Sequence, residues 1–319
     1  MKTYLKTAGI FLTSMLMTVS CSKDDEGNPD PDTQAETYAT TFKMTDAPID
    51  NANVQAVFVT VSDVKVDGTS LEGFNRTTFD LSALVNGKTE TLGNLRLEAG
   101  SYSNIELELD YAMDAAGNAP GCYVETANGD KDKLEASASK INITDTFEVL
   151  ANGANEIVID FDLRKTVKEE QGTVSGNFEF VSMAELSAGI RTVNSEAAGM
   201  ISGTANDAQG TSDKIVVYAY EKGTFDAGTE TEGSGESNVT FAKAVTSSEV
   251  SGADSSYSLN FLAEGDYELV FVSYNRDGNG FFFSSVLEVE STTGLDLGAI
   301  SVTSAIQISA NVTVTGTKS

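Results

Sequence analysis

The sequence predicts an all-β protein. From Thr41 onward, short runs rich in Val, Ile, Thr, Phe and Tyr alternate between apolar and polar residues with a period of two. Gly, Asn and Asp residues that favour turns separate these runs, and the period of amphipathic helices is weak. Short strands divided in this way are typical of β-sandwiches, so we predict two β-sandwich domains behind a lipoprotein signal and a disordered tether.

The first half of the chain holds the clearest strand signals. Residues 105–110 alternate strictly between apolar residues and acids, and residues 157–163 form the strongest strand of this half. Residues 81–85 and 164–170 favour a turn or two of helix. The expected strands are residues 57–61, 64–66, 78–81, 92–97, 105–110, 141–144, 147–150, 157–163 and 178–183.

The second half continues the same pattern from about Ala197. Residues 226–237 are rich in Gly, Glu, Ser and Thr, so we expect a mobile surface loop there. The segment Asp277-Gly278-Asn279-Gly280 favours a hairpin turn. The expected strands are residues 199–203, 215–220, 239–245, 257–262, 267–272, 281–289, 300–302 and 306–314.

The N-terminus has the features of a secretory signal peptide. Lys2 and Lys6 form a short positive region. The apolar stretch that follows, residues 8–19, is shorter than the roughly 20 residues a membrane helix needs. The segment Thr18-Val19-Ser20-Cys21 resembles a lipobox, which implies that Cys21 becomes the first residue and carries a lipid. The acidic run at residues 24–26 resembles the export tag of lipoproteins on the outer face of the outer membrane. We therefore expect a lipid-anchored outer-membrane protein exposed at the cell surface.

These features divide the chain into four expected parts. Residues 1–20 are the signal peptide. Residues 21–40 are a lipidated acidic linker, too poor in large apolar residues to fold. Residues 41–196 and 197–319 are the two β-sandwich domains.

Composition excludes several classes of function. The formal net charge of −28 repels phosphate backbones and anionic lipids, so nucleic acid is not an expected partner and the lipid must provide the membrane contact. The chain has no histidine, which excludes His-based triads and histidine metal sites within it. With Cys21 lipidated, Cys122 has no disulfide partner, and we expect it to be buried. No cofactor is expected.

Four segments of the first half occur in an order that resembles a known family. They are Thr45-Asp46-Ala47-Pro48 with the valine-rich run to Val66, LEAGSYSNI at residues 97–105, LEASASKI at residues 134–141, and Ile159-Asp160-Phe161-Asp162-Leu163 followed by Arg164-Lys165. Together they resemble the domain-of-unknown-function 4382 family, common in bacterial surface lipoproteins, over about residues 41–195. That family has no assigned chemistry, so the resemblance implies fold and location.

The second half resembles a different class of module. Tyr257-Ser258-Leu259 and the segment LAEGDY at residues 262–267 carry the resemblance. It is to transthyretin-like or carboxypeptidase-regulatory-like sandwiches of immunoglobulin-like type. Such modules space, present or bind.

Paired carboxylates are the candidates for catalysis. Asp160 and Asp162 flank Phe161 and therefore lie on one face of a strand, and Glu106, Glu108 and Asp110 share a face in the same way. Two carboxylates can serve a glycosidase. A half-buried sheet with one solvated face gives the same alternation, and we expect these acids to lie on solvated faces.

Two further segments are weak candidates for binding. Asp277 and Asn279 give residues 275–280 a faint resemblance to a calcium loop, but the spaced acids of an EF-hand are missing. A plain hairpin turn is the expected structure, so no metal site is predicted. Residues 281–283, three phenylalanines, are either an exposed binding patch or a buried strand, and we expect the strand.

The predicted function is that of a non-catalytic surface lipoprotein in adhesion or in the binding of a glycan or host ligand. The alternative is a fimbrillin-like structural or accessory subunit of a surface fibre, joined by strand donation. Such subunits are often matured by cleavage after an arginine near the N-terminus. The first arginine here is Arg76, well inside the first domain, which counts against this alternative. The hypothesis of an enzyme is supported only by the paired carboxylates.

Overall fold

The structure is a computed structural model that describes residues 35–48, 54–151, 153–169, 177–277 and 280–318. Within these residues the chain is all-β, as predicted. No helix in this part of the chain is long and apolar enough to cross a membrane. The signal peptide, Cys21 and the acidic run lie outside the described residues.

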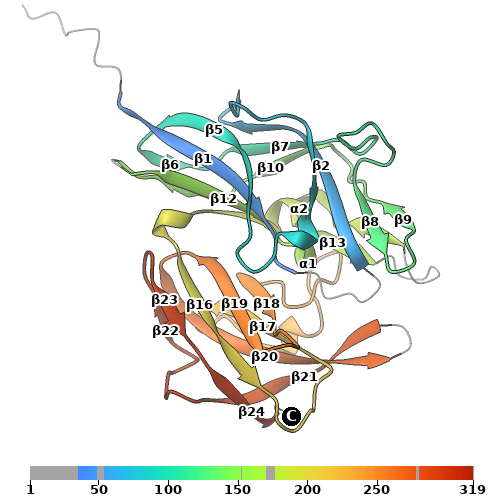
Figure 1. Ribbon diagram of the computed structural model, residues 1–319, viewed down its shortest axis with the longest axis vertical. Helices are drawn as coiled ribbons and strands as arrows, with labels where there is room; N and C mark the ends of the chain where they lie inside the picture. The colour runs from blue at the N-terminus through green and yellow to red at the C-terminus, as the bar shows by residue number, and fades with distance from the viewer. Residues whose placement is uncertain (1–34, 49–53, 152, 170–176, 278–279, 319) are drawn as a thin grey trace, which may run out of the picture. The chain divides into compact units, whose positions relative to one another are not determined.

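A four-stranded mixed sheet forms the first layer (Figure 1), in the order β15-β12-β1-β5. Its strands are β1 (Thr37–Thr45), β5 (Glu90–Glu98), β12 (Asn155–Phe161) and β15 (Ile190–Asn194). β1 runs parallel to β12, with Thr45 opposite Asp160, and antiparallel to β5. β1 begins at Thr37, inside the stretch expected to be linker, because Thr40 is already buried in the sheet.

A seven-stranded sheet forms the second layer, in the order β10-β7-β2-β8-β9 with β3 and β4 also paired to β2. The long β2 (Val54–Val66) unites two expected strands across a register shift between Val61 and Asp63. The other strands are β3 (Thr69–Ser70), β4 (Thr77–Asp80), β7 (Ile105–Leu109), β8 (Tyr123–Thr126), β9 (Lys131–Lys133) and β10 (Lys140–Ile143).

Short elements complete this part of the chain, which we call the first lobe (β1–β15). Two small sheets pair β6 with β11 and β13 with β14. The short elements are β6 (Gly100–Tyr102), β11 (Phe147–Val149), β13 (Val167–Glu169), β14 (Phe178–Phe180), α1 (Leu163–Thr166), α2 (Met183–Ala188) and the 3-10 turns η1 (Leu81–Ala83) and η2 (Ser195–Ala197).

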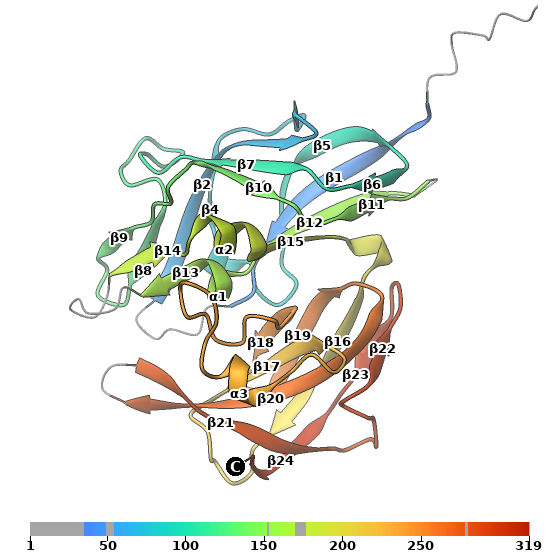
Figure 2. The ribbon, with the colours of Figure 1, turned by 180° about the vertical axis from the view of Figure 1, so that it is seen from behind.

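The core of the first lobe lies between its two larger sheets (Figure 2). Alternate residues of β2, such as Val57, Val59 and Val61, are fully buried and join one apolar cluster with Ile157 and Ile159 of β12. The apolar residues of the period-two pattern therefore face inward from both sheets, as a sandwich requires.

The second lobe (β16–β24) is a nine-stranded sheet, ordered β18-β17-β20-β21-β24-β16-β19, with β22 paired to β20 and β23 to β16. The sheet curls around one core, and its two end strands meet at a seam, where the amide of Ser258 donates to Ser248 Oγ at 3.0 Å. Its strands are β16 (Gly199–Asn206), β17 (Lys214–Glu221), β18 (Thr246–Glu249), β19 (Ser256–Leu262), β20 (Gly265–Asp277), β21 (Gly280–Ser291), β22 (Ile300–Val302), β23 (Gln307–Ser309) and β24 (Val312–Thr317).

Residues 226–237, expected to form a mobile surface loop, are mostly exposed but include a short helix and one buried residue. The helix is α3 (Ala227–Glu230), in which Glu230 is buried and accepts hydrogen bonds from Tyr220 Oη at 3.0 Å and from the amide of Lys243 at 3.1 Å. The strand expected at residues 239–245 is a series of turns, and Phe241 there stacks on Tyr218 with 4.5 Å between ring centroids. Phe241 and Ala244 thus cover the outer face of β17, while the glycine-rich residues 231–238 stay at the surface.

Each lobe contains the same tyrosine turn. In both, the sequence pattern is L-x-x-G-x-Y, at residues 97–102 and 262–267. Tyr102 Oη donates to the carbonyl of Glu98 at 3.0 Å, and Tyr267 Oη donates to the carbonyl of Ala263 at 2.9 Å. A tyrosine that closes a turn onto the backbone a few residues upstream is a feature of immunoglobulin-like sandwiches.

The Tyr267→Phe variant removes only the hydroxyl from the buried tyrosine turn of the second lobe. We expect the free energy of unfolding in urea to fall by about 1 kcal/mol, because the carbonyl of Ala263 loses its partner. Tyr102→Phe is the matched control, with a smaller expected loss since that tyrosine is half-exposed and water can replace the bond. An equal loss at both positions would contradict the role of burial.

Candidate functional site

The strongest concentration of buried charge lies where the two lobes meet. Asp160 and Asp162 are each 3% exposed, so the expectation that they lie on a solvated sheet face is wrong. They do share one face, but basic residues and the second lobe cover it. Asp46 of the Thr45–Pro48 segment is also buried there, and its Oδ1 accepts a hydrogen bond from the amide of Leu163 at 3.0 Å. Two of the segments that carry the family resemblance thus meet at the junction.

Asp160 on β12 and Asp162 at the start of α1 are each paired with an arginine. Arg191 donates to Asp160 Oδ2 through Nε at 2.9 Å and lies 2.7 Å from it through Nη2. Arg164 Nη2 lies 2.7 Å from Asp162 Oδ2, and Lys165 Nζ lies 3.6 Å from the same oxygen. Charged hydrogen bonds of this kind orient the guanidinium groups and keep the buried carboxylates paired.

The same cations donate to backbone carbonyls of the second lobe. Arg164 Nη1 donates to Phe241 O and Arg191 Nη1 to Phe261 O, each at 2.6 Å. Lys165 Nζ donates to Ala244 O at 2.5 Å. Side chains of the first lobe therefore bind the main chain of the second lobe. We call these contacts the junction latch.

Both phenylalanines that accept from an arginine have left-handed backbone. Phe241 has φ of 52° and Phe261 has φ of 55°, values that cost bulky residues on the order of 1–2 kcal/mol. This conformation turns each carbonyl toward its arginine. Apolar contacts support the second site, because Phe261 packs against Val158, Val193 and Ala198.

Burial shifts the ionisation of the cluster. Burial raises the pKa of Asp46 well above its usual value, and the charges of Asp160 and Asp162 raise it further against the hydrogen bond from Leu163. Burial also raises the pKa of Asp160, although Arg191 opposes this shift, and it lowers the pKa of Lys165. Asp160 and Asp162 are both paired with cations beneath the second lobe, so neither of these two carboxylates is placed to act on a substrate.

A second polar contact joins α2 to the second lobe. Ser182 and Glu185 form a capping box at the start of α2. Glu185 also accepts hydrogen bonds from the amide of Ser237 at 3.0 Å and from Ser237 Oγ at 2.6 Å. Burial opposes ionisation, but these bonds and those from Ser182 outweigh it and lower the pKa of Glu185 to about 2.

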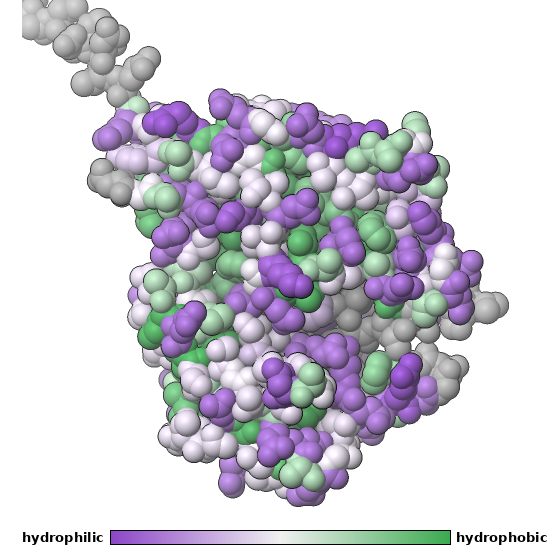
Figure 3. Space-filling model, viewed as in Figure 1, coloured by the Kyte–Doolittle hydropathy of each residue, from purple (hydrophilic) through white to green (hydrophobic). Residues whose placement is uncertain are grey.

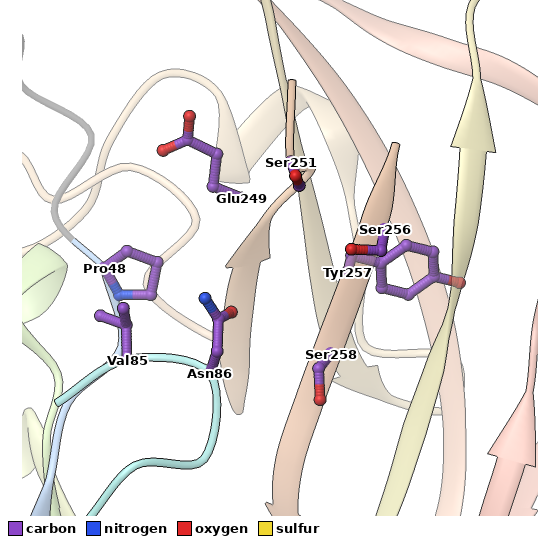
Figure 4. Close-up of a pocket in the computed structure, with 8 residues that line it drawn as sticks. All are labelled: Pro48, Val85, Asn86, Glu249, Ser251, Ser256, Tyr257 and Ser258. Atoms are coloured by element: carbon purple, nitrogen blue, oxygen red, sulfur yellow. The ribbon is translucent and has the colours of Figure 1, made fainter. Parts of the chain in front are cut away.

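A cleft of about 510 Å³ opens beside the latch (Figure 4). Its lining comes from both lobes: Pro48, Val85, Asn86, Glu249, Ser251, Ser256, Tyr257 and Ser258. The amide of Asn86 points into the cleft, whereas the ring of Tyr257 points away from it and its hydroxyl donates to Ala310 O at 2.5 Å inside the second lobe. The volume lies within the range of small-ligand sites.

The Thr45–Pro48 segment also holds in position the turn that forms one wall of this cleft. Thr45 Oγ1 donates to the carbonyls of Leu84 and Lys88, at 2.9 and 2.8 Å, and so holds the turn that carries Asn86. Gly87 in that turn has φ of 78°, and a Cβ there would lie 2.9 Å from the side chain of Asn260 in the second lobe. The left-handed φ favours glycine at this position, and a larger residue would also displace the side chain of Asn260.

The other carboxylate set is a solvated face, as expected. Glu106 and Glu108 on β7 are half-exposed and pair with Lys65 and Lys140 across the sheet, with Nζ–Oε distances from 3.0 to 3.9 Å. Asp110 pairs with Arg76 at 2.8 Å. Hydrogen bonds from the two lysines lower the pKa of Glu106. This arrangement is a surface ion-pair network.

The remaining candidate residues fall in three places. Asp277 ends β20 at an exposed position, while Asn279 lies outside the described residues. No group of three or more Asp, Glu, His or Cys that could hold a metal occurs in the described part of the chain. Cys122 is fully buried, and burial raises the pKa of its thiol to about 12.

The phenylalanine run is mixed in exposure. Phe282 is 47% exposed, whereas Phe283 packs against Phe241 and Phe281 lies under Lys214 and Arg276. The expected buried strand is therefore only partly right. On the face in Figure 3, hydrophobic residues form small separate areas among hydrophilic ones.

The first lobe matches a known family model. Residues 39–180 match the model of a family described as a domain of unknown function (DUF4382), in agreement with the resemblance found in the sequence. The match contains Asp46, Asp160, Asp162 and Arg164, whereas Arg191 and the second lobe lie beyond it. None of the curated proteins matches the chain.

Solved structures show only distant similarity. The Bacillus anthracis TIE protein is 12% identical, with a TM-score of 0.19 over 86% of this chain and 34% of that one, so the chain spans about a third of its length. The major pilin subunit of Bacillus cereus is 11% identical, with a TM-score of 0.20 over 87% and 70% of the two chains. A major pilin of Streptococcus pyogenes is 10% identical, with a TM-score of 0.17 over 90% and 100%. Scores of this size carry no argument about the function of this chain.

The Arg191→Met variant tests the latch. It leaves Asp160 buried without its partner, so we expect the free energy of unfolding to fall by about 3–5 kcal/mol. The double variant Arg191→Met, Asp160→Asn removes the stranded charge and is expected to recover part of that loss. Arg96→Met, at an exposed arginine bonded to Thr37, is the control and should cost less than about 1 kcal/mol. Equal losses at Arg191 and Arg96 would refute the latch.

The hydrogen bonds to Glu185 predict an acid-dependent contribution to stability. Because the pKa falls from 4.5 to about 2 on folding, the ionised side chain stabilises the protein above pH 4.5, and this contribution is lost as the pH falls toward 2. We expect Glu185→Gln to lower the free energy of unfolding by about 1 kcal/mol at neutral pH. The difference from the parent, measured by urea denaturation, should shrink steadily below pH 4.5. A constant difference would show that the charge plays no part.

Proposed function

We propose that this chain is a non-catalytic, lipid-anchored bacterial surface protein whose two lobes present a fixed binding cleft. The observation that carries the proposal is the cleft at the junction, with walls from both lobes and a latch of buried ion pairs beside it. A site built between two lobes keeps its shape only when the lobes do not move, and the latch supplies that rigidity.

The sequence supports the location. The short apolar stretch at residues 8–19 ends next to Cys21 in a lipobox-like segment, and the acidic run follows directly. A lipidated cysteine with more than one acyl chain gives a stable anchor, which the acidic chain could not obtain from anionic lipid. The resemblance of the first half to a family of surface lipoproteins points the same way.

The fate of the carboxylates supports a binding role over an enzymatic one. The strand pair that suggested a glycosidase, Asp160 and Asp162, is bonded to Arg191 and Arg164 beneath the second lobe. The second set, on β7, is neutralised by lysines on an open sheet face. Among the described residues, no specific observation favours the fibre-subunit alternative over a binding protein.

The Cys21→Ala variant tests the anchor. We expect the parent protein to label with fatty acid, to stay with the outer membrane, and to be cleaved when intact cells are treated with protease. The variant should lose the label and the membrane association, because under this proposal the lipid on Cys21 provides the membrane contact. Membrane retention of unlabelled variant would contradict the lipid anchor, and protection of the parent on intact cells would contradict surface exposure.

A further inference from the structure

We propose that the junction cleft binds a neutral glycan, recognised through side-chain hydroxyl and amide groups without a stacking platform. This inference rests on the proposed binding function and specifies its ligand. It also depends on what the cleft offers, beginning with its charge.

The charge of the cleft excludes anionic ligands. Glu249 is the charged residue among those that line it, and its Oε2 lies 2.9 Å from Lys214 Nζ. Lys214 has a side chain only 9% exposed and is committed to that contact. A phosphate, sulfate or sialic acid would therefore meet an acidic protein without a cation to bind it. Neutral ligands avoid this cost.

The polar groups of the cleft suit a ligand that both donates and accepts. Asn86 accepts from Ser248 Oγ at 3.5 Å, and its amide points into the cleft. Ser251 Oγ accepts from the amide of Ala253 at 3.3 Å and its hydroxyl is hydrogen-bonded to Asp254, so the remaining lone pair of the oxygen is what it offers a ligand. Sugar hydroxyls can pair with an amide, a hydroxyl and a carboxylate edge in the same small site.

The backbone of the cleft does not suit a peptide strand. The amide of Ser251 donates to Ser256 O at 2.8 Å, that of Ser256 to Asp254 Oδ1 at 3.1 Å, and that of Ser258 to Ser248 Oγ at 3.0 Å. Strand addition needs a row of unpaired main-chain groups, and these donors are occupied. Recognition must then pass through side chains, which favours a glycan over an extended peptide.

The missing stacking surface sets the strength of binding. The ring of Tyr257 is buried in the second lobe, so the cleft lining offers a sugar hydrogen bonds and the small apolar surfaces of Pro48 and Val85 in a site open to competing water. We expect dissociation constants on the order of millimolar for a single oligosaccharide. Useful affinity would come from many copies displayed together on one membrane.

The test uses the full chain purified in detergent and titrated with maltotriose, mannotriose and lactose at millimolar concentration, with sialyllactose as the charged counterpart of lactose. We expect saturable binding of at least one neutral sugar and none of sialyllactose. The Asn86→Gly, Ser251→Ala variant should weaken binding about tenfold or more. Glycine at position 86 keeps the left-handed φ of 58° without strain, so the variant is designed to stay folded.

The control variant is Asn75→Ala, Ser284→Ala, which removes the same groups from exposed positions outside the cleft lining. It should bind as the parent does. Equal binding by the cleft variant and the parent would place the site elsewhere and overturn the inference. Stronger binding of sialyllactose, binding of unstructured peptides in its place, or no binding of any sugar would also overturn it. These results leave the Cys21 test untouched, so the ligand can fail while the surface location stands.

Discussion

Two buried arginine–aspartate pairs set the relation between the lobes, and the rest of the junction depends on them. Asp160 and Asp162 are buried, and removing Arg191 or Arg164 would leave a buried carboxylate without its cationic partner. Once held there, each guanidinium has a donor directed away from its aspartate, and both donors find a carbonyl of the second lobe. A buried ion pair is by itself weak evidence for stability. Here the pairs also fix the docking geometry, since another docking angle would leave those donors without the carbonyls of Phe241 and Phe261.

The second lobe shows the matching half of the constraint. Phe241 and Phe261 lie far apart in sequence, yet both adopt left-handed backbone and both present a carbonyl to an arginine. Bulky residues adopt this conformation only where the surroundings compel it. In each case a charged donor and the packing of the ring hold the backbone in this conformation: Phe241 stacks on Tyr218, and Phe261 packs on Val158. The local strain of one lobe is thus offset by the electrostatics of the other.

Sequence patterns predicted the strands well because alternation records burial on one face. The same reasoning failed for Asp160 and Asp162, since a period of two shows that two side chains share a face but not what covers that face. For residues 226–237 the glycine-rich composition indicated exposure, which holds for most of the segment, but it gave no sign of α3 or of the buried Glu230. Helix α2 was missed even though Ser182 and Glu185 have the spacing of a capping box.

The cleft could not be predicted by local patterns at all. Its walls include Asn86 and the neighbourhood of Ser248, which are 162 residues apart in sequence and meet only because the lobes dock. The Thr45–Pro48 segment was recognised as a family landmark, but its role in holding the turn around Asn86 requires the hydrogen bonds of Thr45.

The distribution of the basic residues links the latch to the character of the cleft. The chain has 20 basic residues against 48 acids, and three of the basic residues, Arg164, Lys165 and Arg191, are used to bind the second lobe. Lys214, beside the cleft, is held by Glu249. The cluster at the latch also buries three acids, Asp46, Asp160 and Asp162, so the rest of the chain keeps its strongly negative balance. A surface of this charge repels anionic partners over about a Debye length, so a ligand that reaches the cleft must be bound by neutral hydrogen-bonding groups.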